Sequence, residues 1–236
     1  MPIKRQQLVN DEIYHIVTRA AGDSLLFKNI DDYYRGIFSI YEFNNQNPIE
    51  IRVRREQRKK EKANGERFSV DLRECLVEIL AFCFMPNHVH LILKQIKECG
   101  ISNFMRKFGA GYAGYFNKKH NRKGPLLSKF RAVHIKTNEQ LKNCFVYVHA
   151  NPLSLIEPGW KENGIKLSQK AIGFLEEEYK WSSYWDYIGK KNFPSITERK
   201  FILEIMEREE GCCKAIRNWI EYKKGIITSL GNIIIE

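Results

Sequence analysis

The feature that most constrains the fold of this chain is a pair of adjacent apolar runs joined by a short turn. The first run, Glu74–Pro86, is apolar on both alternations of its side chains, which is typical of a central strand covered on both faces. Pro86 and Asn87 predict a turn, and Asn87–Lys94 predicts a second, paired strand. Because the first strand is covered on both faces, other segments have to supply the elements that pack against it.

Five other segments complete an alternating order of elements. Glu12–Ala20 is rich in β-branched and aromatic residues and predicts a strand. Ile30–Asn45 and Ile101–His120 have apolar residues at helical spacing, and glycines in the middle of the second helix would let a neighbour approach closely. Leu126–Ile135 predicts another strand, and Asn138–Pro152 predicts a helix that ends near Asn151, before the proline.

The order strand, helix, strand, strand, helix, strand, followed by one further helix, predicts an α+β fold. We expect a ferredoxin-like split βαβ sandwich, in which an antiparallel sheet has helices on one face. Residues 1–158 are expected to form this domain. After Pro158 the chain is richer in acidic residues and helical in period, so residues 159–236 are expected to form a helical C-terminal extension.

A charge-dense stretch between Arg52 and Asp71 interrupts this pattern and has almost no apolar content. It is expected to be a mobile loop or a charged hairpin, inserted over residues 52–70. It could supply an auxiliary phosphate contact or be only a solvated insertion, and the sequence favours neither.

The charge distribution points to a polyanionic partner, with nucleic acid ahead of a membrane surface. The net charge is +11 and the pI about 9.3. No acidic residue occurs between Cys99 and Asn138, so this segment is interpreted as a phosphate-contacting surface. The side chains expected to bind DNA there are Arg106, Lys107, Lys118, Lys119, Arg122, Lys123, Lys129 and Arg131. On the first strand, Arg19 and His15 could also contact phosphate.

The sequence carries no signal for a membrane or an oxidising compartment. No apolar run approaches the roughly 18 to 20 residues that span a bilayer, and the N-terminal residues lack the pattern of a secretory signal. A cytoplasmic, nucleoid-associated location is therefore expected. The six cysteines show no C-x-x-C spacing and are expected to be free thiols, with Cys83 and Cys144 buried.

Two histidines in the second strand of the hairpin are the first candidates for chemistry. His88 and His90 lie two residues apart and therefore share a face, with Val89 turned to the other side. Two such imidazoles can converge on one divalent ion. Taken alone, however, the pair is better explained as strand histidines with ordinary hydrogen bonds.

A second pair strengthens the interpretation as a metal site. Tyr147 and Asn151 lie four apart on a predicted helix and share a face. If that helix packs near the histidine strand, Asn151 could offer a third ligand oxygen and Tyr147 would lie over the metal. A phenol in that position could attack a phosphodiester whose developing charge the metal offsets.

Other candidates have simpler explanations. Tyr112 and Tyr115 lie on an apolar stripe and are expected to pack or stack rather than act as nucleophiles. His134 and His149 are expected to be a strand-face and a helix-surface residue. The aromatic residues expected to pack in the helical extension are Trp181, Tyr184 and Trp185.

Four segments together resemble a known family. In order and spacing, residues 82–93, 111–126, 130–135 and 147–152 resemble the single-tyrosine HUH transposases of the IS200-like superfamily. The REP-associated tyrosine transposases are the most similar branch. The resemblance covers approximately residues 8–158.

The resemblance implies a metal-dependent enzyme that nicks single-stranded DNA beside a hairpin and transfers the strand. Tyr147 matches the nucleophile that forms a 5′-phosphotyrosine link and releases a 3′-hydroxyl. His88, His90 and Asn151 match the ligands of Mg²⁺ or Mn²⁺, of which Mn²⁺ is physically easier for two imidazoles. The alternative is a non-catalytic nucleic-acid-binding module on the same fold. Whether the protein is a monomer or a homodimer, and whether Tyr147 acts in its own chain, stays open.

Overall fold

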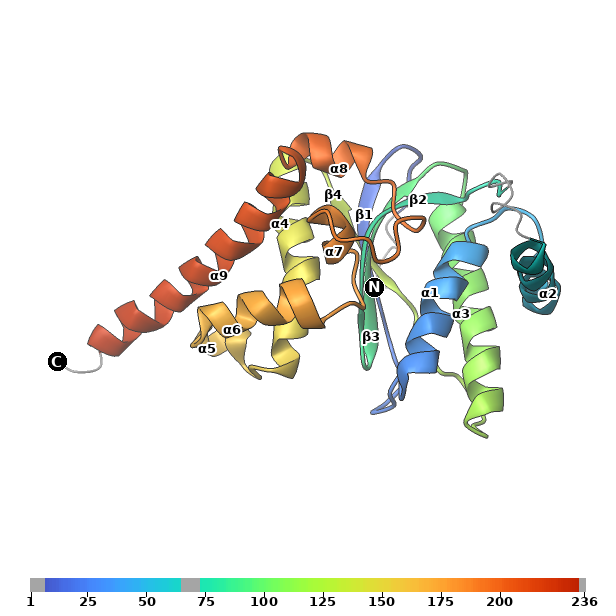
Figure 1. Ribbon diagram of the computed structural model, residues 1–236, viewed down its shortest axis with the longest axis horizontal. Helices are drawn as coiled ribbons and strands as arrows, with labels where there is room; N and C mark the ends of the chain where they lie inside the picture. Colours follow the sequence, from blue (N-terminus) through green and yellow to red (C-terminus); the bar gives the residue numbers. More distant parts are fainter. Residues whose placement is uncertain (1–6, 65–72, 234–236) are drawn as a thin grey trace, which may run out of the picture.

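The computed structural model describes residues 7–64 and 73–233, and within them the chain folds around one antiparallel sheet of four strands (Figure 1). The strands are β1 (Ile13–Arg19), β2 (Val77–Met85), β3 (His88–Gln95) and β4 (Arg131–Ile135). They lie in the order β2-β3-β1-β4. Because β3 lies between β1 and β2, the sheet has the split βαβ arrangement. The predicted α+β class and ferredoxin-like sheet are confirmed, but the expectation of helices on only one face is wrong, because helices pack on both faces of the sheet.

Helices α1 (Ile30–Glu42) and α3 (Gly100–Lys119) cover one face of the sheet (Figure 1). The side chain of Asn29 caps α1 by accepting a hydrogen bond from the backbone N–H of Asp32. Gly111 lets α3 approach the end of α1, because a Cβ there would lie 2.0 Å from Cζ of Phe43. This contact confirms the expectation that a glycine of this helix admits a close neighbour.

Helix α4 (Asn138–Ala150) packs on the opposite face of the sheet (Figure 1). Thr137 caps it by accepting from the Gln140 N–H, and the 3₁₀ turn η1 (Asn151–Leu155) follows directly. The C-terminal segments are α5 (Trp160–Asn163), α6 (Ser168–Gly173), the π-helical turn η2 (Phe174–Glu178), α7 (Tyr184–Tyr187), α8 (Lys200–Ile205) and α9 (Arg208–Ile233).

The segment after Pro158 is helical, as expected, and it shares a hydrophobic core with the sheet. Cys83 and Ile92 from the strands, Phe145 from α4 and Ile216 from α9 belong to one buried cluster. The C-terminal helices therefore cover α4 rather than standing apart from it. A domain boundary at residue 158 stays a prediction.

The charge-dense stretch is a helix, so the expectation of a mobile loop or hairpin is wrong for its described part. Helix α2 spans Ile51–Ala63. The buried carboxylate of Glu42 anchors it, accepting from Arg54 at 3.2 Å and pairing with Arg58 at 2.7 Å. Residues 65–71 of the stretch lie outside the described residues. Two arginines of this helix pair with Glu42 on α1, a contact that the sequence of the stretch does not predict.

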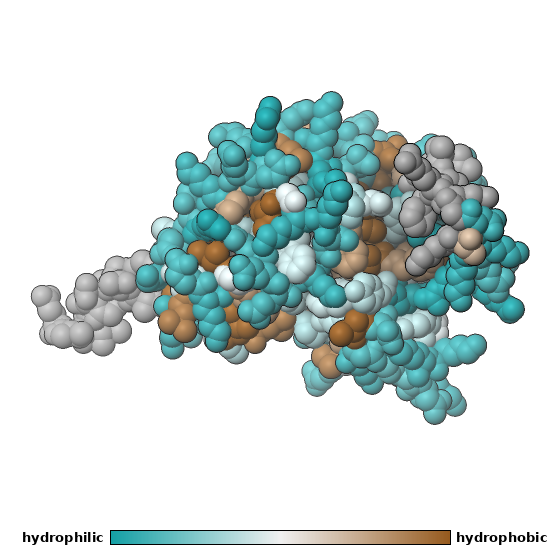
Figure 2. Space-filling view, in the orientation of Figure 1, coloured by the Kyte–Doolittle hydropathy of each residue, from teal (hydrophilic) through white to brown (hydrophobic). Residues whose placement is uncertain are grey.

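The face drawn in Figure 2 is mostly hydrophilic. In the view of Figure 2, apolar side chains form small, separate areas, and the side chains over α2 are mainly hydrophilic. No helix in the described part of the chain combines the length and the apolarity needed to cross a bilayer.

Candidate active site

Three histidines and a tyrosine meet on the sheet face that α4 covers. β3 supplies His88 and His90, and β1, its neighbour, supplies His15. Val89 is fully buried among the residues that pack against α1 and α3. The alternation expected of the strand is therefore confirmed. Helix α4 places the ring of Tyr147 against that of His90.

The four rings form one compact cluster. The ring centroids of His88 and His90 are 4.8 Å apart, and those of His15 and His90 are 5.1 Å apart and nearly parallel. The Tyr147 ring lies edge-on to both His90 and His15, at 5.6 and 5.8 Å. Tyr147 is 37% exposed whereas His90 is 2% exposed. A solvent-accessible phenol thus lies directly beside a buried imidazole.

Hydrogen bonds orient the two strand histidines. Nδ1 of His88 lies 2.7 Å from Oδ1 of Asn87, and Nδ1 of His90 lies 2.9 Å from Nε2 of His15. Burial lowers the pKa of His15 to about 4, so this ring is neutral at pH 7 and its Nε2 can accept a hydrogen bond from the Nδ1–H of His90. In the tautomer in which both Nδ1 atoms donate, each strand histidine presents an unprotonated Nε2, the form in which imidazole binds metals.

Asn151 lies one helical turn beyond Tyr147 and is 2% exposed. Its Nδ2 donates to the Tyr147 carbonyl oxygen at 2.7 Å, and its Oδ1 is the side-chain atom whose chemistry suits a cation. Among the described residues, no group of three or more His, Cys, Asp or Glu side chains is arranged to hold a metal ion. The donor set of two imidazole nitrogens and one amide oxygen is chemically compatible with a divalent ion, and Mn²⁺ suits it better than Mg²⁺.

His15 belongs to this cluster, although the pattern of its own segment indicates no more than a phosphate contact. The alternation of β1 places His15 and Arg19 on one face. The split βαβ order then brings β1 beside β3, with Arg19 opposite His88. Strand order combined with alternation was therefore the signal that could have found it.

The basic residues expected to bind DNA do not form a single surface. Arg19 and Arg131 are exposed on the strands beside the ring cluster, and Lys129 is exposed just before β4. Val133 on the same strand is 60% exposed, so this part of the sheet face is not covered by helices. These three cations thus flank the ring cluster.

Three other basic side chains form hydrogen bonds with groups of the protein itself. Nζ of Lys107 donates to three carbonyl oxygens that follow α1, at 2.5 to 2.9 Å. Burial, followed by the nearby charge of Arg106, lowers the pKa of Lys107. The guanidinium of Arg122 donates to the carbonyl oxygens of Gly124 and Pro125, which orders the turn after α3. The remaining side chains, Arg106, Lys118 and Lys123, are exposed on α3 and the following turn.

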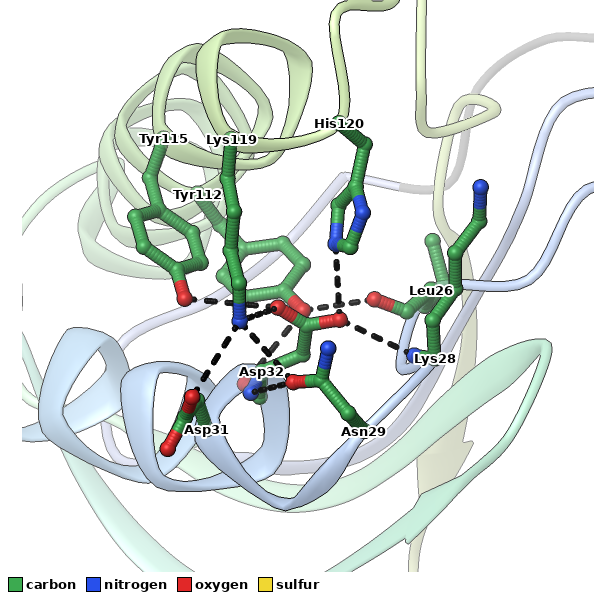
Figure 3. Close-up of polar contacts among 9 residues, drawn as sticks. All are labelled: Leu26, Lys28, Asn29, Asp31, Asp32, Tyr112, Tyr115, Lys119 and His120. Carbon is green, nitrogen blue, oxygen red and sulfur yellow. Dashed lines mark hydrogen bonds and ion pairs between the residues drawn. The ribbon is translucent and has the colours of Figure 1, made fainter.

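Lys119 is the third basic side chain with partners inside the protein, and it belongs to a network around the buried carboxylate of Asp32 (Figure 3). That carboxylate accepts from Lys119 Nζ at 2.9 Å, His120 Nε2 at 2.9 Å and the Lys28 backbone N–H at 3.0 Å. Burial by itself raises the pKa of Asp32, but these hydrogen bonds outweigh it and hold the pKa below its ordinary value. The network joins the start of α1 to the end of α3.

His149 is not the helix-surface residue that the sequence suggested. It is fully buried, and its Nε2 lies 2.8 Å from Oγ of Ser183. Burial lowers its pKa to about 3. The expectation failed because the C-terminal segment packs over the side of α4 that the helix pattern alone left open. Tyr112 is fully buried in the core, as expected of a packing residue.

Comparison with known proteins relates part of the chain to one family. Residues 51–149 match the family model described as "Transposase IS200 like", which confirms the resemblance to IS200-like transposases over that segment. Asn151 lies just beyond it. No curated protein matches the chain. A solved structure described as "Structure of the REP associates tyrosine transposase bound to a REP hairpin" is similar at 13% identity. That similarity covers 85% of this chain and 96% of that chain, with a TM-score of 0.47.

Proposed function

Since residues 51–149 match the family model of the IS200-like transposases, we propose that this protein is a single-tyrosine transposase. It would nick single-stranded DNA and transfer the strand. The observation that supports it most directly is the contact of the Tyr147 ring with the rings of His90 and His15. A nucleic-acid-binding module has no need of an accessible phenol held against buried imidazoles.

In the proposed reaction, Oη of Tyr147 attacks a phosphodiester of the DNA. The new bond joins Oη to phosphorus, the phenolic proton is lost, and the bond from phosphorus to the 3′ oxygen breaks. The leaving oxygen takes up a proton and becomes a 3′-hydroxyl, so a 5′-phosphotyrosine link results without any redox change. Attack of a 3′-hydroxyl on that link would reverse the step and join strands.

His88, His90 and Asn151 would hold a divalent ion beside Tyr147. When bound there, Mn²⁺ or Mg²⁺ would polarise the phosphodiester and offset its developing negative charge. Asn87 and His15 would act as positioning residues, because their contacts with the Nδ1 atoms fix which nitrogen each strand histidine presents.

The DNA would lie along the open part of the sheet face. Arg19 and Arg131 are exposed on strands next to the ring cluster and Lys129 precedes β4, so phosphates on either side of the scissile bond would meet positive charge. A hairpin beside the cleavage site is the substrate feature that the sequence resemblance implies.

A covalent-adduct assay tests this proposal. The full-length protein is incubated with Mn²⁺ or Mg²⁺ and labelled single strands that carry hairpins from the DNA flanking its own gene. We expect a denaturant-resistant protein–DNA adduct that Tyr147→Phe abolishes. The matched control, Tyr222→Phe, alters a tyrosine that is 66% exposed on α9 and should leave the adduct at its wild-type level.

The same assay can contradict the proposal in two ways. An adduct that persists in Tyr147→Phe would show that another residue is the nucleophile. Binding of these strands without any adduct, in the presence of either ion, would favour the non-catalytic binding module. Loss of the adduct in both His88→Ala and His90→Ala, with retained DNA affinity, would support the metal role of the histidines.

A further inference from the structure

A large groove lies on the side of the molecule away from the ring cluster. It has a volume of about 920 Å³ and lies between α1, α2 and the loop at residues 192–196. In Figure 1, α2 lies on the far side of α1 and α3 from the sheet. The volume falls in the range of small-molecule sites, roughly 300 to 1,000 Å³, and none of the proposed tyrosine chemistry uses this groove.

The floor of the groove holds a buried cation. Arg35 is only 8% exposed and lines the groove. Its guanidinium lies over the rings of Tyr115 at 4.8 Å and Phe38 at 5.9 Å. Within the described part of the chain, its Nε is buried without a hydrogen-bond partner. A buried charge is normally paired with an opposite charge or fully hydrogen-bonded, so this arginine indicates that an anion belongs beside it.

Two arginines of α2 add to the positive charge at the same place. Arg55 and Arg58 each lie 5.4 Å from the centre of the Phe38 ring, which the guanidinium of Arg35 also contacts. Burial, followed by the charge of Arg55, lowers the pKa of Arg35. Three guanidinium groups around one ring repel one another, and an anion in the groove would relieve that repulsion.

The acidic side chains in and next to the groove have other partners. Glu42, which does not line the groove, pairs with Arg54 and Arg58. Asp31 lies 3.6 Å from Lys119, and Glu61 accepts from Gln57 at 3.1 Å. Arg35 and Arg55 therefore remain as the charges that an incoming anion would meet.

The walls of the groove are aromatic. Tyr34 is 46% exposed, and its ring lies edge-on to that of Phe193 at 6.3 Å. Lys180 donates to the Tyr34 hydroxyl at 2.9 Å and lies over its ring. Phosphate-binding cations beside exposed aromatic rings are the combination that binds single-stranded nucleic acid, because unpaired bases can stack on such rings.

From these contacts we infer that the groove between α1 and α2 is a second nucleic-acid site, which binds a segment of single-stranded DNA away from Tyr147. A backbone phosphate lies between Arg35 and Arg55, and an adjoining base stacks on Tyr34. A free nucleotide has the same chemistry, phosphate plus base, and is the alternative source that the experiment separates. The inference concerns binding alone and does not depend on the chemistry of Tyr147.

The test measures the affinity of a fluorescent oligothymidylate of about 12 nucleotides by anisotropy, at several salt concentrations. Arg55→Gln should weaken binding roughly threefold to tenfold and lower the salt slope by about one. The matched control is Arg52→Gln on the same helix, which removes an equal charge. The Arg52 side chain is 90% exposed and pairs with Glu56, so this variant should bind within about twofold of wild type.

Crosslinking locates the bound strand. An oligonucleotide that carries 5-iodouracil should crosslink to Tyr34, and Tyr34→Ala should remove that crosslink while crosslinks on the sheet face persist. Equal weakening by Arg55→Gln and Arg52→Gln, or crosslinks confined to the sheet face, would overturn the inference. Displacement of the oligonucleotide by dTMP or dAMP at an equal molar concentration would also overturn it, because a free nucleotide would then be the ligand.

Discussion

Replacing Asp32 tests how the buried network at the start of α1 stabilises the fold. The Asp32→Asn variant keeps the shape of the side chain but removes its charge, and its new NH₂ group faces donors. Lys119 Nζ, His120 Nε2, the Lys28 N–H and the Tyr115 hydroxyl all point at the carboxylate (Figure 3). Asparagine can accept from only part of this set.

The size of the loss follows from the burial of these contacts. A hydrogen bond to a charged group contributes about 1.5 to 3 kcal/mol, and breaking a buried pair costs about 3 to 5 kcal/mol. The side chain of Lys119 is 27% exposed and can turn towards water when the carboxylate is removed. We therefore expect Asp32→Asn to lower the free energy of unfolding by about 2 to 4 kcal/mol. For a chain of this length that corresponds to a decrease in Tm of roughly 5 to 15 °C.

The effect should depend on pH in a defined direction. The folded-state pKa of Asp32 is lowered, so the carboxylate stabilises the fold above its unfolded pKa of about 3.9. That contribution is lost as the pH falls through the folded-state pKa. The difference in unfolding free energy between wild type and Asp32→Asn should therefore be full at pH 6 to 7 and shrink below about pH 4.

Chemical denaturation followed by circular dichroism at several pH values measures this difference. The control is Asp31→Asn, which alters the preceding residue; the Asp31 side chain is 83% exposed and lies 3.6 Å from Lys119. It should change the unfolding free energy by no more than about 0.5 kcal/mol. Equal losses in the two variants, or a difference for Asp32→Asn that stays constant from pH 7 to pH 3, would refute the reasoning.

Two further substitutions test the packing. Gly111→Ala should lower the unfolding free energy by about 1 to 3 kcal/mol, because its Cβ would overlap the Phe43 ring. Gly114→Ala, with no atom within 4 Å of its Cβ, should instead raise the unfolding free energy by about 0.5 to 1 kcal/mol. Thermal unfolding compares the two variants, and a loss of stability in both would contradict the argument. Ser183→Ala should lower the unfolding free energy by about 2 to 3 kcal/mol, because the buried Nε2 of His149 and the Phe82 N–H both lose a partner. A Tm within error of wild type would contradict this.

Most elements of the fold could be predicted from the sequence because their patterns are local. Alternation identified β3 and the shared face of His88 and His90, and helical spacing identified α1 and α3. Each of these patterns records which side of one element is buried, and that is decided within about ten residues. The order of these elements along the chain then predicted the split βαβ arrangement.

Helix α2 and the basic segment were predicted less well because their structure depends on distant partners. The arginines of α2 are held by Glu42, which belongs to α1. Lys107 and Lys119 share the acid-free segment with Lys129, yet the first two bind to groups around α1 and only the third is exposed near the site. A one-signed run of charges does not say which side chains meet solvent.

For the candidate site, the sequence by itself determined which side chains share a face. The spacing of two in a strand fixes His88 and His90 on one side, and the spacing of four in a helix fixes Tyr147 and Asn151. Only the tertiary structure decided that Tyr147 meets His90, and that His15 joins them from β1. The physical reason is that periodicity fixes directions within an element, whereas contact between elements depends on strand order and on the core that packs α4 against the sheet.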